Sequence, residues 1–208
     1  NVRIGEPVSH QESFRLLTGN GRYADDIEVE RLAYAVFVRS PHAHARLRGI
    51  DIAAAKRAPG ILAVMTGVDA LAAGLKPIPH TPGGEGGGAD IPLLDRPGFN
   101  RVKVPHFPIV TDKARAVGEV VAMVVGETID AAKDGADRVE VDYETLPAVT
   151  HALDAVRADA PRVWDEHPAN LCIDAEVGDR DATDAAFAKA PHVSRFAGWI
   201  QRVTGVHI

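Results

Sequence analysis

Two histidines and an arginine stand where an apolar segment ends, and their side chains could do chemistry. His42 and His44 are two residues apart, so on a strand they would point to the same side and supply half of a metal site. No Asp, Glu or Cys nearby completes that ligand set, so we expect no metal here and expect both rings to bond to the backbone or to a partner chain. Arg39 could bind an anion such as phosphate, or pair with an acid across a domain interface, and we favour the second.

Three further sets of residues have side chains that could act in catalysis or binding. Glu140, Asp142 and Glu144 form an acidic stripe on one strand face, which we expect to meet solvent or a basic partner rather than to do acid–base work. Gly118-Glu119 indicates a close approach of two backbones beside a solvated or paired acid. The glycine run at 83–88 lacks the Lys-Ser/Thr and the helix of a phosphate cradle. We find no Ser-His-Asp or Cys-His arrangement in the sequence.

The elements that must position these side chains can be read from apolar periodicity. Residues 32–38 alternate as a strand that is apolar on both faces, which predicts cover on both sides. Ser40-Pro41 then breaks the strand. Further strands are expected at 45–50, 61–65 and 119–126, with short helices at 53–57 and 69–73. Residues 128–139 predict a helix with Thr128 as its N-cap, and the strand at 138–143 would complete a βαβ unit.

The remaining segments have different compositions. Residues 1–30 read as an irregular arm, and residues 151–170 as a surface crossover rich in Ala, Asp and Pro. A strand at 171–177, a helix at 179–190 and a weak strand pair within 193–208 follow. Residues 74–108 hold seven prolines and the glycine run, so they cannot form a core of their own and should be a functional or disordered loop that proteases cut readily.

Composition limits the class of protein. The net charge of −6 argues against nucleic acid as a partner. The single cysteine, Cys172, can form neither an internal disulfide nor an iron–sulfur site. No apolar run approaches the roughly 20 residues of a membrane span, and the first residues lack the apolar core of a signal peptide. A reducing cytoplasm fits these features best.

Five blocks in a fixed order carry a resemblance to a known family. They are residues 15–26 (RLLTGNGRYADD), 32–46 (LAYAVFVRSPHAHAR), 50–67, 117–125 (VGEVVAMVV) and 139–149 (VEVDYETLPAV). Together they resemble the N-terminal part of the large, molybdopterin-binding subunit of molybdenum hydroxylases, the family of xanthine dehydrogenases, aldehyde oxidases and aerobic carbon monoxide dehydrogenases.

The resemblance implies an α+β fold, an α/β hammerhead-like mixed sheet with short helices plus the start of a second α/β domain. It divides the chain into an arm at 1–18, the hammerhead domain at 19–150, and at 151–208 a crossover and the beginning of the cofactor-binding portion, apparently truncated. The family's cofactor-binding glycine motif and catalytic glutamate have no counterpart here. Arg39, Ser40, His42, His44, Gly118 and Glu119 are then expected to form an interface.

The same resemblance implies an oxidoreductase that this chain cannot complete by itself. The complete enzyme would hydroxylate an aldehyde, an N-heterocycle or a similar small substrate with water, or oxidise carbon monoxide, at a molybdenum–molybdopterin centre. FAD and [2Fe-2S] clusters would lie on partner domains or on iron–sulfur and FAD subunits, in the bacterial three-subunit arrangement. This chain alone is expected to bind no cofactor. The alternative is a free-standing, non-catalytic binding or assembly domain that uses residues 39–44 and the long loop.

Overall fold

The computed structural model describes residues 4–5, 7, 10–78 and 94–199, and these form two compact units. One unit spans Ala33–Pro191, and the other combines the residues up to Leu32 with those from His192 onward. The second unit contains the short helix α1 (Ser13–Leu17) and a 3₁₀ turn, η1 (Ala24–Asp26). The structure describes no strand in its residues 193–199, so this part of the expected strand pair is wrong, and the rest of that pair lies outside the described residues.

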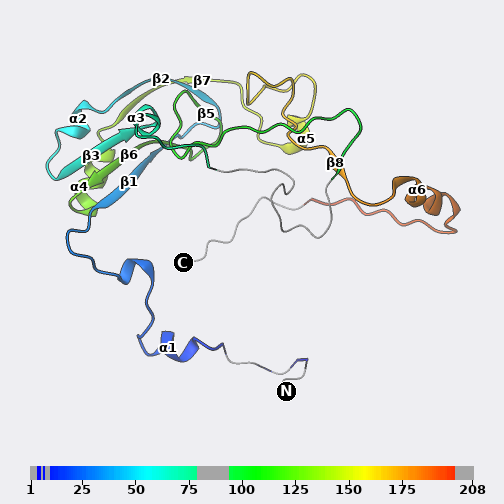
Figure 1. The fold of residues 1–208 in the computed structure, drawn as a ribbon, viewed down its shortest axis with the longest axis horizontal. Helices are drawn as coiled ribbons and strands as arrows, with labels where there is room; N and C mark the ends of the chain where they lie inside the picture. The colour runs from blue at the N-terminus through cyan, green and yellow to red at the C-terminus, as the bar shows by residue number, and fades with distance from the viewer. Residues whose placement is uncertain (1–3, 6, 8–9, 79–93, 200–208) are drawn as a thin grey trace. The chain divides into compact units, whose positions relative to one another are not determined.

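The first sheet of the larger unit has the strand order β1-β6-β3, and both pairings are antiparallel. Its strands are β1 (Tyr34–Arg39), β6 (Val120–Gly126) and β3 (Ile61–Thr66). Helices α4 (Ile129–Ala136) and α2 (Ala53–Lys56) pack on this sheet, and Figure 1 shows α4 lying against β6 and β1. Val64 and Val124 form the buried core with Ala55, and Val38 and Ile61 are partly buried against it.

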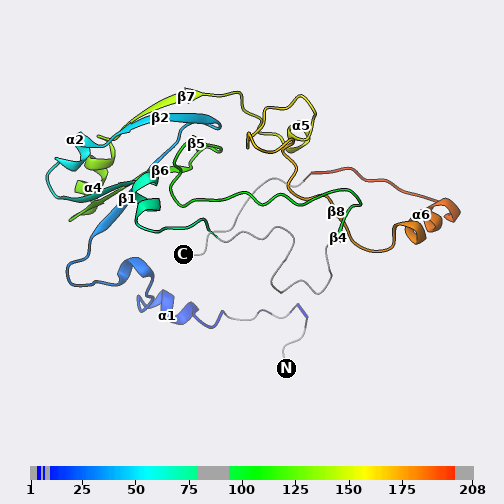
Figure 2. The same ribbon diagram turned by 45° about the horizontal axis from the view of Figure 1, so that its top comes forward.

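The second sheet has the order β5-β2-β7, again with antiparallel pairs. It consists of β2 (Ala45–Asp51), β7 (Glu140–Thr145) and the short β5 (Lys113–Ala114). In Figure 2, β2 and β7 run side by side over their whole length. A two-stranded ribbon pairs β4 (Leu94–Asp95) with β8 (Ala175–Glu176). The chain also forms α3 (Gly67–Ala72), α5 (Ala152–Ala155) and α6 (Arg180–Lys189).

The α+β fold class is confirmed, and helix caps show why the local predictions succeed. The Thr128 hydroxyl accepts a bond from the N–H of Ala131 (3.1 Å) at the start of α4, and the Asp179 carboxylate accepts one from Ala182 N–H (2.9 Å) at the start of α6. Both satisfy N–H groups that a helix cannot pair internally. The predicted strand at 171–177 shrinks to β8, and the domain boundaries at 18 and 150 stay predictions.

Two expectations about the sheets are wrong. The βαβ unit does not form, because β6 and β7 belong to different sheets and all of the strand pairs in the three sheets are antiparallel. The described residues of the larger unit also leave one face of β1 uncovered, since Ala35 and Phe37 are exposed. The middle of the long loop, 79–93, lies outside the described residues. Among the residues that are described, no helix has the length and apolar character to cross a bilayer.

Gly67 offers a test of how β3, α3 and the segment before β5 pack together. A Cβ on Gly67 would lie 2.7 Å from the carbonyl carbon of Val110, which is backbone and cannot move aside cheaply. We therefore expect Gly67→Ala to lower the free energy of unfolding by about 1–3 kcal/mol, although alanine is the better helix former. Urea denaturation would measure this change.

Gly49 provides the matched control for that substitution. Its added Cβ would meet no atom within 4 Å, and its φ is not left-handed, so Gly49→Ala should leave stability nearly unchanged. Equal losses from the two variants would contradict the packing described for Gly67.

Candidate functional site

The structure brings four of the six predicted interface residues into one backbone clasp, although they lie in two segments far apart in the chain. The N–H of Ser40 donates to the carbonyl of Glu119 (2.8 Å), and the N–H of Gly118 donates to the carbonyl of Ser40 (2.8 Å). The Arg39 guanidinium donates to the carbonyl of Gly118 (2.8 Å). Gly118 has φ +88°, which is strained for other residues and explains the glycine. The clasp therefore holds the end of β1 to the start of β6.

Arg39 is locally satisfied rather than paired with an acid. Besides its bond to Gly118, its guanidinium carbon lies 5.6 Å from the centroid of the Phe37 ring, within the range of a cation–π contact. Within residues 10–78 and 94–199 it makes no ion pair, so the acid expected for it across an interface is not in the described part of this chain. Arg39 is exposed and remains available to a partner.

The two histidines have different surroundings. The His42 ring packs edge-on against Tyr143 of β7, with centroids 4.9 Å apart. The backbone N–H of His42 donates to the hydroxyl oxygen of Ser40 (3.1 Å), and Ser40 is almost fully buried. Burial raises the pKa of the Tyr143 hydroxyl above its usual value, and a hydrogen bond with Ser40 opposes this rise. His42 thus joins the clasp to the second sheet.

His44 is buried and bonds to the backbone, as the sequence predicted for a structural histidine. Its Nδ1 lies 2.7 Å from the carbonyl oxygen of Pro147, which can only accept, so Nδ1 carries the proton. Nε2 is buried without a hydrogen-bond partner. Across the described ranges, no group of three or more His, Cys, Asp or Glu side chains is placed to hold a metal ion.

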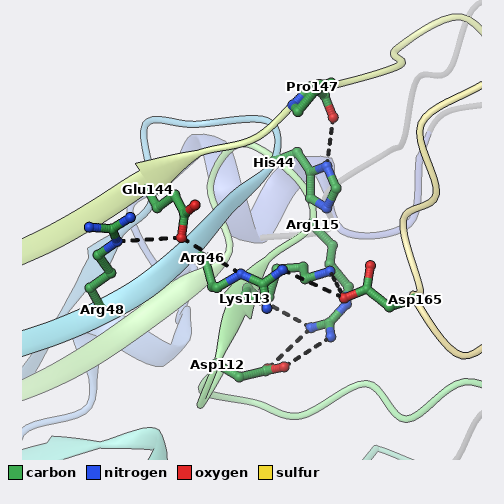
Figure 3. Close-up of polar contacts among 9 residues, drawn as sticks. All are labelled: His44, Arg46, Arg48, Asp112, Lys113, Arg115, Glu144, Pro147 and Asp165. Atoms are coloured by element: carbon green, nitrogen blue, oxygen red, sulfur yellow. Dashed lines mark hydrogen bonds and ion pairs between the residues drawn. The ribbon is translucent and has the colours of Figure 1, made fainter.

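An ion pair that the sequence did not predict joins a buried lysine to an exposed aspartate close to His44. Lys113 of β5 is only 2% exposed, and its Nζ lies 2.7 Å from the Asp165 carboxylate, which belongs to the crossover segment (Figure 3). The hydrogen bond from Lys113 is the largest cause that holds the pKa of Asp165 below its usual range, and the charges of Lys113, Arg46 and His44 add to it. No local pattern marks this pair, because its members are far apart in sequence.

Arg115, two residues along from Lys113, forms the wall of a small cavity. Its guanidinium lies 3.8 Å from the centroid of the Trp164 ring and 3.3 Å from the Asp112 carboxylate. The backbone N–H of Arg115 donates to the Glu119 carboxylate (2.6 Å), so the predicted acid at 119 is hydrogen-bonded to the backbone. These residues line a cavity of about 220 Å³ together with His106 and Phe107. Arg115 pairs with Asp112 and stacks on Trp164, and Glu119 accepts a bond from the backbone, so these side chains join segments to one another, which suits a structural junction better than catalysis.

The predicted acidic stripe lies on β7, and its last member meets a basic partner. The Glu144 carboxylate is 3.3 Å from Arg48 Nε and 3.8 Å from Arg46 Nε, both on the neighbouring strand β2 (Figure 3). All three side chains are partly or largely exposed, so each pair stabilises the sheet by less than about 1 kcal/mol. These cross-strand ion pairs show how this chain builds a solvated sheet face.

Comparison with known proteins identifies the kind of domain that this geometry forms. Residues 18–82 match the family model described as "Aldehyde oxidase and xanthine dehydrogenase, a/b hammerhead domain". The fold agrees with solved structures: carbon monoxide dehydrogenase from Oligotropha carboxidovorans matches with TM-score 0.68 and 29% identity over 90% of this chain and 22% of that chain. Quinoline 2-oxidoreductase from Pseudomonas putida 86 matches with TM-score 0.64 and 32% identity over 81% of this chain and 20% of that one.

Curated sequences give the same result. The carbon monoxide dehydrogenase large chain of Afipia carboxidovorans is 33% identical over 88% of this chain and 22% of its own length. The nicotine 6-hydroxylase large subunit of Paenarthrobacter nicotinovorans is 36% identical over 91% of this chain and 21% of its own length. The chain belongs to the molybdenum hydroxylase family of oxidoreductases. It spans about a fifth of the length of the large subunits that it matches.

The Lys113–Asp165 pair predicts an asymmetry between two substitutions. Asp165→Asn leaves the buried Lys113 ammonium without its counter-charge. Lys113→Met removes that ammonium and replaces the side chain with an uncharged, apolar one of similar length. We expect Asp165→Asn to lower the free energy of unfolding by about 1–3 kcal/mol, less than for a fully buried pair because Asp165 itself is largely in water. Lys113→Met should cost less, and Asp159→Asn, at an exposed acid in the same segment, should be nearly neutral. Urea denaturation would rank the three variants, and the reverse order would contradict the account.

The same pair predicts a loss of stability in acid. A carboxyl whose pKa is lower when folded contributes stability above its ordinary pKa of about 3.9, and the contribution is lost as pH falls through the lower folded value. The urea midpoint of the wild-type chain should therefore fall below about pH 4. The Asp165→Asn variant should show a shallower fall over that range, while an unchanged slope would exclude Asp165 as a contributor.

Proposed function

We propose that this chain is the N-terminal part of the large subunit of a molybdenum hydroxylase, where it serves as a structural and assembly section. The observation that carries the proposal is the agreement of sequence and fold with large subunits over most of this chain. The described residues support a structural role, because the ion pairs and hydrogen bonds of the site join segments of the chain to one another. This family membership favours an enzyme section over the alternative of a free-standing binding domain.

The residues described here do not fit the family's cofactors. A [2Fe-2S] cluster needs four ligands, mostly thiolates, whereas Cys172 is the only cysteine in the sequence. The guanidinium of Arg115, a candidate for an anionic cofactor group, is already bound to Asp112 and to the carbonyl of Lys113. Molybdenum–molybdopterin would therefore be held by the remainder of the large subunit, and FAD and the [2Fe-2S] clusters by iron–sulfur and FAD subunits.

The complete enzyme would act on a small molecule. By analogy with the named activities of the relatives, it would hydroxylate an aldehyde or an N-heterocycle with water as the oxygen source, or oxidise carbon monoxide. The molybdenum centre would supply that chemistry, with electrons passing through the iron–sulfur clusters to FAD. A cytoplasmic location is in keeping with the lone, unpaired cysteine.

Cofactor analysis tests this proposal. The 208-residue chain alone should contain no stoichiometric molybdenum, iron or flavin. The complete large subunit, purified with its partner subunits, should contain all three and should oxidise an aldehyde, an N-heterocycle or carbon monoxide. Metal analysis and the absorption spectrum are the readouts. Molybdenum bound by the isolated chain, or a complete complex without molybdenum, would overturn the assignment.

We also propose that the clasp, together with His42 and His44, serves as an interface with the remainder of the enzyme. Arg39 and the half-buried His42 would supply contacts, while Ser40, His44, Gly118 and Glu119 hold the turn in shape. Arg39→Ala should lower the yield of assembled, cofactor-loaded enzyme more than it lowers the melting temperature of this chain. Arg48→Ala removes an exposed arginine from the second sheet and is the matched control. Normal assembly and full cofactor content in the Arg39→Ala enzyme would show that Arg39 is only a local surface residue.

A further inference from the structure

One face of the β1-β6-β3 sheet is apolar and is left open to solvent by the described residues of the larger unit. The strand register places six side chains on it in two rows of three: Ala35, Val125 and Ala63 in one, and Phe37, Met123 and Met65 in the other. Their neighbours along each strand, among them Val36, Val124 and Val64, point to the opposite face, where the helices lie. Phe37 is 45% exposed, Ala35 and Ala63 are exposed, and the other three side chains are half-buried.

The second sheet shows that this apolar face is not how the chain builds a surface for water. There, Arg46 and Arg48 on β2 pair with Glu144 on β7, and these side chains are exposed. Antiparallel sheets with one solvated face normally alternate apolar and polar residues in this way. None of the six residues in the two rows is polar. A contiguous exposed apolar patch of this kind marks an interaction surface.

We propose that this open face is an intramolecular docking surface, covered in the complete large subunit by an apolar segment of the same polypeptide outside these 208 residues. The inference rests on the function proposed above. Curated relatives carry the matching region as 22% and 21% of one continuous chain, so most of a large subunit is available in cis to cover it. Permanent interfaces are more apolar than transient ones, so a surface of six apolar residues is typical of a permanent interface.

Two features indicate how the covering segment would be recognised. Met65 and Met123 lie side by side in the register, and their unbranched side chains adapt to the shape of a neighbour. Arg39 lies over the ring of Phe37 at the rim of the face. A segment with branched aliphatic side chains towards the two rows, and with a carboxylate or carbonyl near Arg39, has the matching chemistry. The docking face would then be continuous with the clasp.

Photo-cross-linking in the complete enzyme tests the occupant directly. With p-benzoylphenylalanine in place of Phe37, irradiation should join this position to a peptide of the same polypeptide outside these 208 residues. Mass spectrometry would map the peptide, and the denatured subunit should keep its single-chain mass. Capture of an iron–sulfur or FAD subunit, a doubled mass from a second copy, or no cross-link at all would each overturn the proposal.

A matched position on the other sheet controls for non-specific capture. The same cross-linker in place of Arg48 should react at least about ten-fold less with protein, because its face is charged and hydrated. Equal capture at both positions would overturn the link between apolar character and docking. Molybdenum is measured in the same preparations. A complex that contains molybdenum but is cross-linked in trans refutes only this inference, whereas a complex without molybdenum refutes the proposed function.

Discussion

The arrangement of the first sheet and its helices depends on β6, the central strand of that sheet. β1 and β3 pair with its two edges, so its backbone groups are satisfied without solvent. Val121, Ala122 and Val124 are buried on it, and Val124 belongs to the core. The segments at the two ends of β6 hold other features in place. Gly118 and Glu119, just before the strand, bond to Ser40 in the clasp, and Thr128, just after it, caps α4. A polar residue in place of Val124 would disturb the core through which the sheet packs on its helices.

Most of the local structure could be predicted from the sequence, because it is determined by neighbouring residues. The apolar run at 119–126 and the hydroxyl of Thr128 act over a few positions, and β6 and α4 form where they indicate. The partner of a strand is not a local property. The sequence at 138–143 predicted the strand β7 correctly but placed it beside β6, whereas cross-strand pairs with β2, such as Glu144 with Arg46, assign it to the other sheet.

The candidate site shows the same division. Arg39, Ser40, Gly118 and Glu119 were chosen from two separate patterns, and the structure joins them through backbone bonds that neither pattern encodes. His42 and His44 would share one side of a strand, but residues 40–44 form no strand. One ring packs on Tyr143 and the other bonds to Pro147, so they do not share a ligand. The Lys113–Asp165 pair could not be predicted, since its members lie 52 residues apart in the sequence and no local pattern joins β5 to the crossover segment.

The placement of β3 next to β6 has a consequence for how this fold tolerates change. β3 and β6 are hydrogen-bonded neighbours in the sheet, but the segment between Thr66 and Val120 is long and leaves the sheet before it returns. The entropy of closing such a connection grows only with the logarithm of its length, so doubling it costs about 0.6 kcal/mol. The domain can therefore gain residues at exposed positions of this connection, such as Lys76 and Pro77 after α3, at little thermodynamic cost. The later part of the connection differs, because β5 pairs with β2 and because Gly118 and Glu119 form the clasp. An inserted tag or a grafted loop belongs at the exposed positions, where it leaves the antiparallel ladder untouched.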